Sequence, residues 1–298
     1  MYTAYALITH LESSDDELLF QDFKLSRIDT LGDRQDAIRA LPGVDVSFGD
    51  WVYKRIYDDV PGPRNYSSVG RIPADTEDSL LLFRLFKVGD ICFLKHSVET
   101  PDGRLLQRFP HRIMMDLISA SPYPFRQSEC ARWDAFATEL RNLPCWETEW
   151  FGVARRFFLF GGAKEFILGS EMDRIVDYVI ALEAALVPES DFVGKRLRER
   201  AMRVTGRDKR FRNLIRDFYG FRSDIVHGSG IATGKLNRVG QGMLEFEQGV
   251  RDILVSALRG LPADRKSRER QLAEMYHASV GDRVREAIRY LRPIVAIG

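Results

Sequence analysis

The sequence contains few cysteines and no long hydrophobic run. Its 298 residues include three widely spaced cysteines, Cys92, Cys130 and Cys145, and no Cys-x-x-Cys pair. This pattern argues against a disulfide framework and a zinc module, and favours reduced thiols. The densest apolar stretch, Phe157–Phe160, is far shorter than the roughly 20 residues that span a bilayer. The first residues also lack the basic start and apolar core of a secretory signal. We therefore expect a cytoplasmic protein with no membrane partner.

The composition is that of a folded chain, with 45% hydrophobic and 29% charged residues. The length favours two domains. The net charge of +1 hides an asymmetry: residues 1–140 hold 16 Lys and Arg against 22 Asp and Glu, whereas residues 141–298 hold 28 against 21. The basic second half is therefore the candidate for binding an anionic partner.

The front part of the chain has the pattern of a mixed α+β domain. A helix is predicted over Asp78–Lys87, a loop over Pro61–Asn65, and a hairpin turn at Pro101–Gly103. Extended segments are predicted at Thr3–Leu11, Leu18–Arg27, Val44–Phe48, Trp51–Tyr57 and Asp90–Val98. We expect residues 1–135 to form an N-terminal recognition or regulatory domain.

The back part has helical periodicity almost throughout. The first predicted helix covers Trp146–Phe160 and stops at Gly161-Gly162, and the third begins at a cap, Ser190 or Asp191, and ends at about Val204. The other predicted helices cover Glu171–Val187, Asp208–His227, Gln241–Arg259, Ala263–His277 and a short segment before Pro293. Residues 136–298 are therefore expected to form an all-α bundle, which gives an α+β fold class for the whole chain.

The helix expected to end before Gly228 carries Arg222 and His227 in an Arg-x4-His spacing. This pair suits metal-free RNA cleavage, in which a ribose 2′-hydroxyl attacks the neighbouring phosphate. Histidine has an ordinary pKa of about 6.5 and serves as a proton acceptor near neutral pH. A guanidinium stays charged and stabilises the negative charge that builds on the phosphate oxygens. The structural alternatives are a salt-bridge arginine and a histidine that interacts with the helix dipole.

Two further features concern the same pair. Glu183 lies on an apolar helix face, so its carboxylate is expected to form an ion pair with Arg222. Five helical residues rotate by about 140° and rise about 7.5 Å, so Arg222 and His227 do not share one helix face. A two-fold dimer that packs these helix ends together would bring two copies of the pair into one cleft.

A cluster of basic residues precedes the candidate pair. Arg196, Arg200, Arg203 and Arg207 recur at helical spacing, opposite a predicted apolar face of Val193, Leu197, Ala201 and Val204. Lys209 and Arg210 follow them. An exposed ridge of this kind is the electrostatic footprint expected for phosphate backbones, so these six residues are predicted to bind RNA. The alternative is an ordinary solvated helix face.

Residues 145–260 resemble a HEPN domain (higher eukaryotes and prokaryotes nucleotide-binding) of the Apea-like branch. The resemblance lies in Ile180–Leu186, Leu197–Val204 and Phe218–Gly228, with Arg222-x4-His227-Gly228 as its signature; Leu80–Cys92 resembles, less specifically, the regions that accompany such domains. It implies a homodimeric, metal-independent endoribonuclease with Arg222 and His227 as the catalytic pair. Supporting roles in the site are assigned to Glu183, Tyr219, Ser223 and Asp224. No metal or cofactor is implied.

Such proteins act as toxins or in phage defence by cleaving tRNA or other cellular RNA, and the N-terminal domain would then bind an antitoxin or trigger. Two other readings remain open. In one, the HEPN module is catalytically inactive and binds RNA, a nucleotide or a protein partner. In the other, the protein is an interaction scaffold whose acidic N-terminal domain masks the basic bundle.

Overall fold

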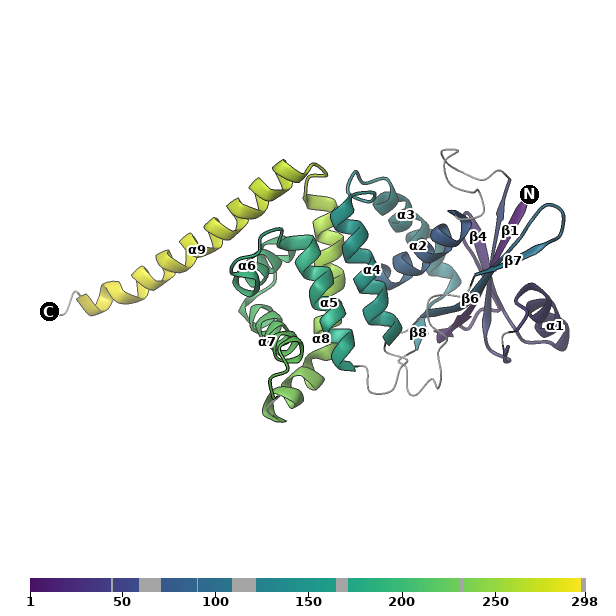
Figure 1. Cartoon of the computed structure of the whole chain (residues 1–298), viewed down its shortest axis with the longest axis horizontal. Coiled ribbons are helices and arrows are strands. Elements are labelled where there is room, and N and C mark those ends of the chain that lie inside the picture. The colour runs from purple at the N-terminus through teal and green to yellow at the C-terminus, as the bar shows by residue number, and fades with distance from the viewer. Residues whose placement is uncertain are drawn as a thin grey trace. The chain divides into compact units, whose positions relative to one another are not determined.

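The computed structural model describes residues 1–43, 45–58, 71–89, 91–108, 122–164, 171–230 and 233–295. The chain divides into two compact units. The first comprises Met1–Glu139 and Gly162–Ser170, and the second comprises Leu140–Gly161 and Glu171–Gly298. The first unit contains the strands and the second is helical (Figure 1), so the predicted α+β fold class is confirmed.

The N-terminal unit is built on a six-stranded sheet in the order β3-β4-β5-β1-β6-β7, with antiparallel neighbours. Its strands are β1 (Tyr2–Thr9), β3 (Glu17–Leu19), β4 (Phe23–Arg27), β5 (Trp51–Tyr57), β6 (Cys92–Glu99) and β7 (Leu105–Arg108). A short parallel pair joins β2 (Leu11–Glu12) to β8 (Tyr123–Pro124). In the middle of the sheet, Tyr5 of β1 lies opposite Lys54 of β5 and Ser97 of β6.

Alternation along the strands gives the sheet two packed faces. On one face, Leu7 packs with Ala37 of helix α1 (Leu31–Ala40), which begins with a capping box between Thr30 and Asp33. On the other face, Phe23 lies against Phe83 of α2 (Arg71–Phe86) and Trp133 of α3 (Cys130–Arg141), with ring centroids 4.7 to 6.1 Å apart. Tyr53 belongs to this aromatic layer, so its neighbour Lys54 points toward the α1 side.

The helical unit packs its helices through a continuous apolar core. Its main helices are α4 (Glu149–Lys164), α5 (Glu171–Leu186), α6 (Val193–Thr205), α7 (Lys209–Val226), α8 (Thr233–Gly260) and α9 (Arg265–Val295). Phe218 of α7 stacks on Phe246 of α8 at a centroid distance of 3.9 Å. Leu197 and Ala201 of α6 are fully buried, as their spacing predicted.

The structure corrects several predicted strands. Trp51–Tyr57 is confirmed, but Leu18–Arg27 is two strands, because the chain turns at residues 20–22 and Phe20 stacks back on Phe23. Residues 45–48 form no strand, and α1 was not predicted. The hairpin turn at Pro101–Gly103 is confirmed, since β6 and β7 pair on either side of it. The predicted loop at Pro61–Asn65, and Val44 and Asp90, lie outside the described residues.

Three helix ends also differ from expectation. Gly161-Gly162 does not stop α4; a β-carbon at Gly161 would lie 2.7 Å from the ring of Tyr178, so this glycine gives α5 room to pack. Helix α8 begins at Thr233 rather than Gln241. Helix α9 runs without a break from Arg265 to Val295, because Gly281, which lies inside it, costs only about 1 kcal/mol in a helix interior.

Candidate functional site

Helix α7 presents the candidate site at its C-terminal end. Asp208 caps the helix by accepting a hydrogen bond from the backbone N–H of Phe211 at 3.2 Å. His227 is the C-cap residue, and Gly228 adopts a positive φ of 65°. The helix buries Phe211, Ile215, Phe218 and Phe221. The predicted helix over Asp208–His227 and its left-handed glycine stop are therefore confirmed.

Arg222 and Glu183 form the ion pair that the sequence predicts. The Nη2 atom of Arg222 lies 3.4 Å from Oε2 of Glu183, and the two side chains are 22% and 18% exposed. The Nε atom of Arg222 and the Oε1 atom of Glu183 are buried and have no hydrogen-bond partner within the described part of the chain. Buried polar groups are seldom left unpaired. The pair therefore has hydrogen-bonding capacity beyond its single contact.

Burial changes the acid–base properties of this site. It raises the pKa of Glu183, and the positive charge of Arg222 opposes the rise. Burial also raises the pKa of Tyr219, as does the charge of Glu183, so the phenol remains a hydrogen-bond donor. Sequence reasoning missed Gly194, the second residue of α6: a β-carbon there would lie 2.5 Å from the Tyr219 ring. The sequence clue was a glycine in the first turn of α6, a position where glycine is less favourable for a helix than other residues.

The raised pKa of Glu183 predicts a pH dependence of stability. Between its ordinary and raised pKa, the folded protein binds a proton that the unfolded chain does not hold, so the free energy of unfolding falls as the pH rises through that window. Glu183→Gln removes this contribution. The wild-type stability minus that of the variant should therefore decrease with rising pH in urea unfolding from about pH 4 to 7. A difference that is constant, or that grows with pH, contradicts the assignment.

The remaining residues of the predicted site lie around the end of α7. His227 is exposed, and its backbone N–H donates to the carbonyl of Ser223 at 3.0 Å. Asp224 is engaged by an ion pair with Lys235 of α8. The structure thus brings Arg222, Glu183 and Tyr219 together, and it leaves the His227 imidazole in solvent about one and a half helical turns further along the chain.

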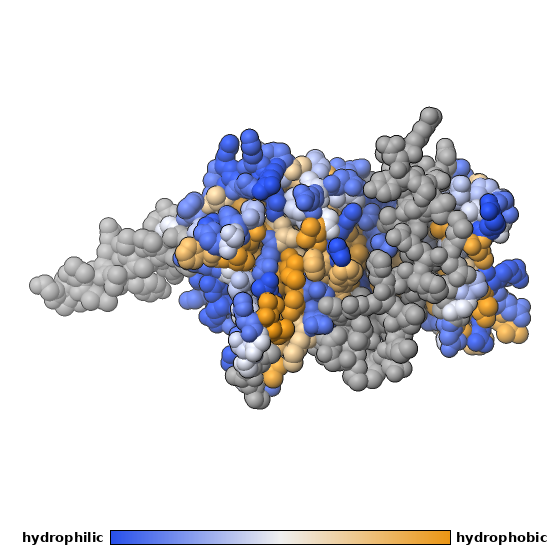
Figure 2. Space-filling model, in the orientation of Figure 1, coloured by the Kyte–Doolittle hydropathy of each residue, from blue (hydrophilic) through white to orange (hydrophobic). Residues whose placement is uncertain are grey.

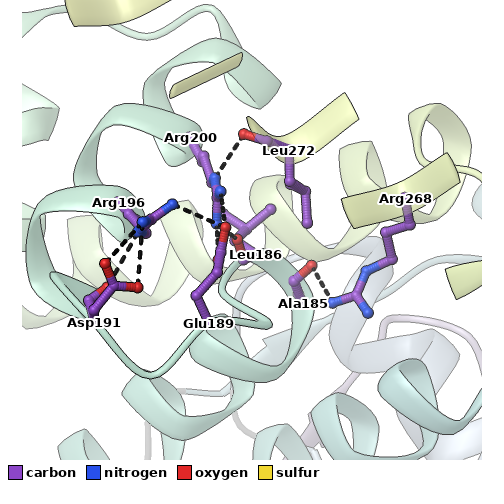
Figure 3. Close-up of polar contacts among 8 residues, drawn as sticks. All are labelled: Ala185, Leu186, Glu189, Asp191, Arg196, Arg200, Arg268 and Leu272. Carbon is purple, nitrogen blue, oxygen red and sulfur yellow. Dashed lines mark hydrogen bonds and ion pairs between the residues drawn. The ribbon is translucent and has the colours of Figure 1, made fainter. Parts of the chain in front are cut away.

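The predicted basic ridge is only partly exposed: Arg203, Lys209 and Arg210 are exposed, but Arg200 is buried. Arg200 is fully buried, and it donates to both carboxylate oxygens of Glu189 at 2.6 Å and to the carbonyls of Leu186 and Leu272 at 2.8 Å (Figure 3). Arg196 pairs with Glu189 and with Asp191. Asp191 therefore does not cap α6, which begins after Phe192 without a side-chain cap. The physical reason is that α9 covers this face of α6.

The other four residues of the ridge differ in exposure. Arg203 donates to Ser279 of α9 at 3.1 Å. Arg207 pairs with Asp252 and lies over the Phe211 ring, 4.7 Å from its centroid. Lys209 and Arg210 remain exposed, and Arg210 pairs with Glu245 at 3.0 Å. Arg203, Lys209 and Arg210, the three exposed members of the set, are therefore best placed to meet a polyanion.

Sequence reasoning also missed the role of Arg268 in α9. Its guanidinium donates to the carbonyls of Ala184 (2.6 Å) and Ala185 (3.0 Å), and Figure 3 shows it beside the end of α5. Arg200 reaches the next carbonyl, Leu186. The two cations satisfy terminal carbonyls and oppose the negative end of the helix dipole. Burial lowers the pKa of Arg268 to about 10, which leaves it charged at neutral pH.

The described residues contain neither a metal-binding cluster nor a membrane-spanning helix. No group of three or more His, Cys, Asp or Glu side chains is arranged to hold a metal ion in the described ranges. No helix in those ranges has the length and apolar character needed to cross a membrane. Comparison with family models, with curated proteins and with solved structures finds no match to this chain.

Proposed function

We propose that this protein is a metal-independent endoribonuclease of the HEPN type that acts as a dimer. The observation that carries the proposal is the arrangement of α7: an incompletely bonded Arg222–Glu183 pair lies near an exposed helix end that presents His227. A partly exposed guanidinium and an accessible imidazole are the two groups that cleavage by a 2′-hydroxyl requires.

In this mechanism His227 removes the proton of the 2′-hydroxyl, and the oxygen attacks the adjacent phosphorus. Arg222 binds the phosphate oxygens as their negative charge grows, while Glu183 holds the guanidinium in place. The 5′-oxygen leaves, takes a proton from the imidazolium or from a second His227, and a 2′,3′-cyclic phosphate remains. Tyr219 donates a hydrogen bond near the same charge.

A second copy of the chain would complete the site, because Arg222 and His227 lie on different faces of one helix. The helical unit has apolar surface for such an interface. On the face drawn in Figure 2, hydrophobic residues gather in a band on the helical part of the chain. Among the described residues of the helical unit, the exposed large apolar side chains are Val153, Met172, Phe192, Val226, Leu236 and Leu244. Val226 directly precedes His227.

The biological role that fits this chemistry is a cytoplasmic toxin or phage-defence effector that cleaves tRNA or other cellular RNA. The N-terminal unit would then bind the antitoxin or trigger protein. These assignments rest on the HEPN resemblance.

Purified protein tests the chemistry directly. We expect cleavage of total RNA to persist in excess EDTA, and the products to carry 2′,3′-cyclic phosphate ends, because the proposed mechanism uses only side chains. End-group mapping by ligation with and without cyclic-phosphate removal distinguishes the products. Cleavage that requires magnesium, or that leaves 3′-hydroxyl ends, contradicts the proposal.

One observation favours a second candidate, a catalytically inactive HEPN module that binds RNA, a nucleotide or a protein. Glu183 opposes the charge of Arg222, and most of the expected ridge is engaged within the bundle. Such a module would bind its partner through the exposed Lys209 and Arg210 and would leave RNA intact.

A further inference from the structure

The N-terminal unit contains a cavity that the nuclease chemistry does not use. Its volume is about 520 Å³, within the range of small-molecule sites. It lies on the α1 side of the sheet, and β1, β4 and β5 form its floor. Tyr5, Val52 and Ala37 supply an apolar lining, and charged side chains of both signs complete it.

Strand register places three polar side chains in a row across this floor. Lys24 of β4 lies opposite Lys54 of β5, which lies opposite Tyr5 of β1. Two lysines directly opposite each other repel. Lys24 is neutralised by Glu17, since their charged atoms are 2.6 Å apart and the hydrogen bond from Lys24 lowers the pKa of Glu17.

Lys54 has no such partner. In the described chain no carboxylate lies within 4 Å of its ammonium group. The Nζ atom instead lies over the Tyr5 ring, 5.8 Å from the ring centroid. The other cations of the lining are paired: Arg27 with Asp16 and Asp29, and Arg39 with Asp36. Lys54 is thus the cation available to an anionic group in the cavity.

Glu99 of β6 supplies the opposite charge on the far side of Tyr5. Its Oε2 accepts a hydrogen bond from the Tyr5 hydroxyl at 3.3 Å, and no cation within the described ranges pairs with it. Lys54 lies opposite Tyr5 and Glu99 lies opposite Thr3, on the two strands that neighbour β1, so the backbones of Lys54 and Glu99 are roughly 12 Å apart. A free ammonium group and a free carboxylate therefore flank one aromatic ring.

We propose that this cavity binds a small zwitterion with a carboxylate, an ammonium group and an apolar body, the chemistry of a free amino acid or a short peptide. The ligand carboxylate pairs with Lys54, the ligand ammonium pairs with Glu99, and the apolar body packs against Tyr5 and Val52. The proposal is independent of the nuclease assignment.

Calorimetric titration of the full-length protein tests this site with charge-edited probes. The probes are the common amino acids, Gly-Phe, N-acetyl-phenylalanine, which lacks the cation, and phenylalaninamide, which lacks the anion. We expect at least one zwitterion to bind, and the matching edited analogue to bind roughly tenfold to hundredfold more weakly. Tighter binding of Gly-Phe than of phenylalanine assigns the site to peptides, and the reverse assigns it to amino acids.

Variants assign each charge to its partner. Lys54→Met should weaken binding of the zwitterion about as much as removing the ligand carboxylate does, and should leave the affinity for phenylalaninamide unchanged. Glu99→Gln should do the same for the ligand ammonium. Arg132→Met is the matched control, because Arg132 of α3 is 69% exposed, is paired with Glu129 and does not line the cavity, so the variant should bind as the wild type does. Circular dichroism melting verifies that each variant is folded. Zwitterions that fail to bind at millimolar concentration, or equal affinity for edited and unedited probes, overturn the proposal.

Discussion

Replacing His227 with alanine is expected to reduce RNA cleavage by about 10²- to 10⁴-fold, because the 2′-hydroxyl then has no general base. The imidazole is exposed, and His227 caps the end of α7 through its backbone N–H, which alanine retains. The melting temperature should therefore not change. Single-turnover cleavage of labelled RNA measures the loss. His277→Ala is the matched control, since it removes an exposed histidine of α9 and should retain full activity.

Replacing Arg222 tests the other half of the proposed pair. Arg222→Ala should reduce cleavage by about 10²- to 10³-fold, the cost of losing a group that stabilises the transition-state charge. Arg216→Ala is its control on the same helix, because Arg216 is 54% exposed and, among the described residues, forms its ion pair with the neighbouring Asp217. Arg216→Ala should cleave RNA as the wild type does.

A structural role for Arg222 predicts a different result. Arg222→Ala leaves the buried Glu183 carboxylate without its cation, which lowers stability. The double variant Arg222→Ala/Glu183→Gln removes that charge and should recover stability, while cleavage stays lost. Recovery of cleavage together with stability would show that Arg222 only supports the fold. Full activity of His227→Ala would remove the nuclease assignment altogether.

The sequence predicted the parts of this site that depend on local pattern. Helix α7 was placed to within one residue at each end, because an apolar stripe and a glycine stop agree there. The Glu183–Arg222 pair followed from two charged residues on apolar faces. Dimerisation and catalysis remain predictions.

The features that the sequence could not reveal depend on contacts between distant segments. Periodicity placed Arg196 and Arg200 opposite the apolar face of α6, but a helix in a bundle can be covered on more than one side. Only the long α9, which follows some 60 residues later, decides that Arg200 is buried. Likewise, the ring of Tyr178 explains why Gly161 lies inside a helix rather than after it.

The buried position of Arg200 leads to the largest expected effect on stability. Its guanidinium joins three segments: it holds Glu189, binds the last carbonyl of α5, and binds the Leu272 carbonyl of α9. Burial alone would raise the pKa of Glu189, but hydrogen bonds and charge from Arg200 hold that pKa below its ordinary value. Removing Arg200 leaves the Leu186 and Leu272 carbonyls without this donor, and leaves the Glu189 carboxylate with Arg196 as its remaining cation among the described residues.

Arg200→Met is therefore expected to lower the free energy of unfolding by about 3–5 kcal/mol. Arg210→Met is the matched control, since Arg210 is 80% exposed in a simple surface pair, and it should cost less than about 1 kcal/mol. Urea unfolding gives the totals, and amide hydrogen exchange locates the loss, which should concentrate where α5, α6 and α9 meet. The two variants should also differ in RNA binding. Arg210→Met should weaken RNA binding while the protein stays folded, whereas Arg200→Met should weaken it only by unfolding the protein. Equal stability of the two variants would mean that α9 does not enclose Arg200 in solution, and the exposed basic ridge would then become the better description of α6.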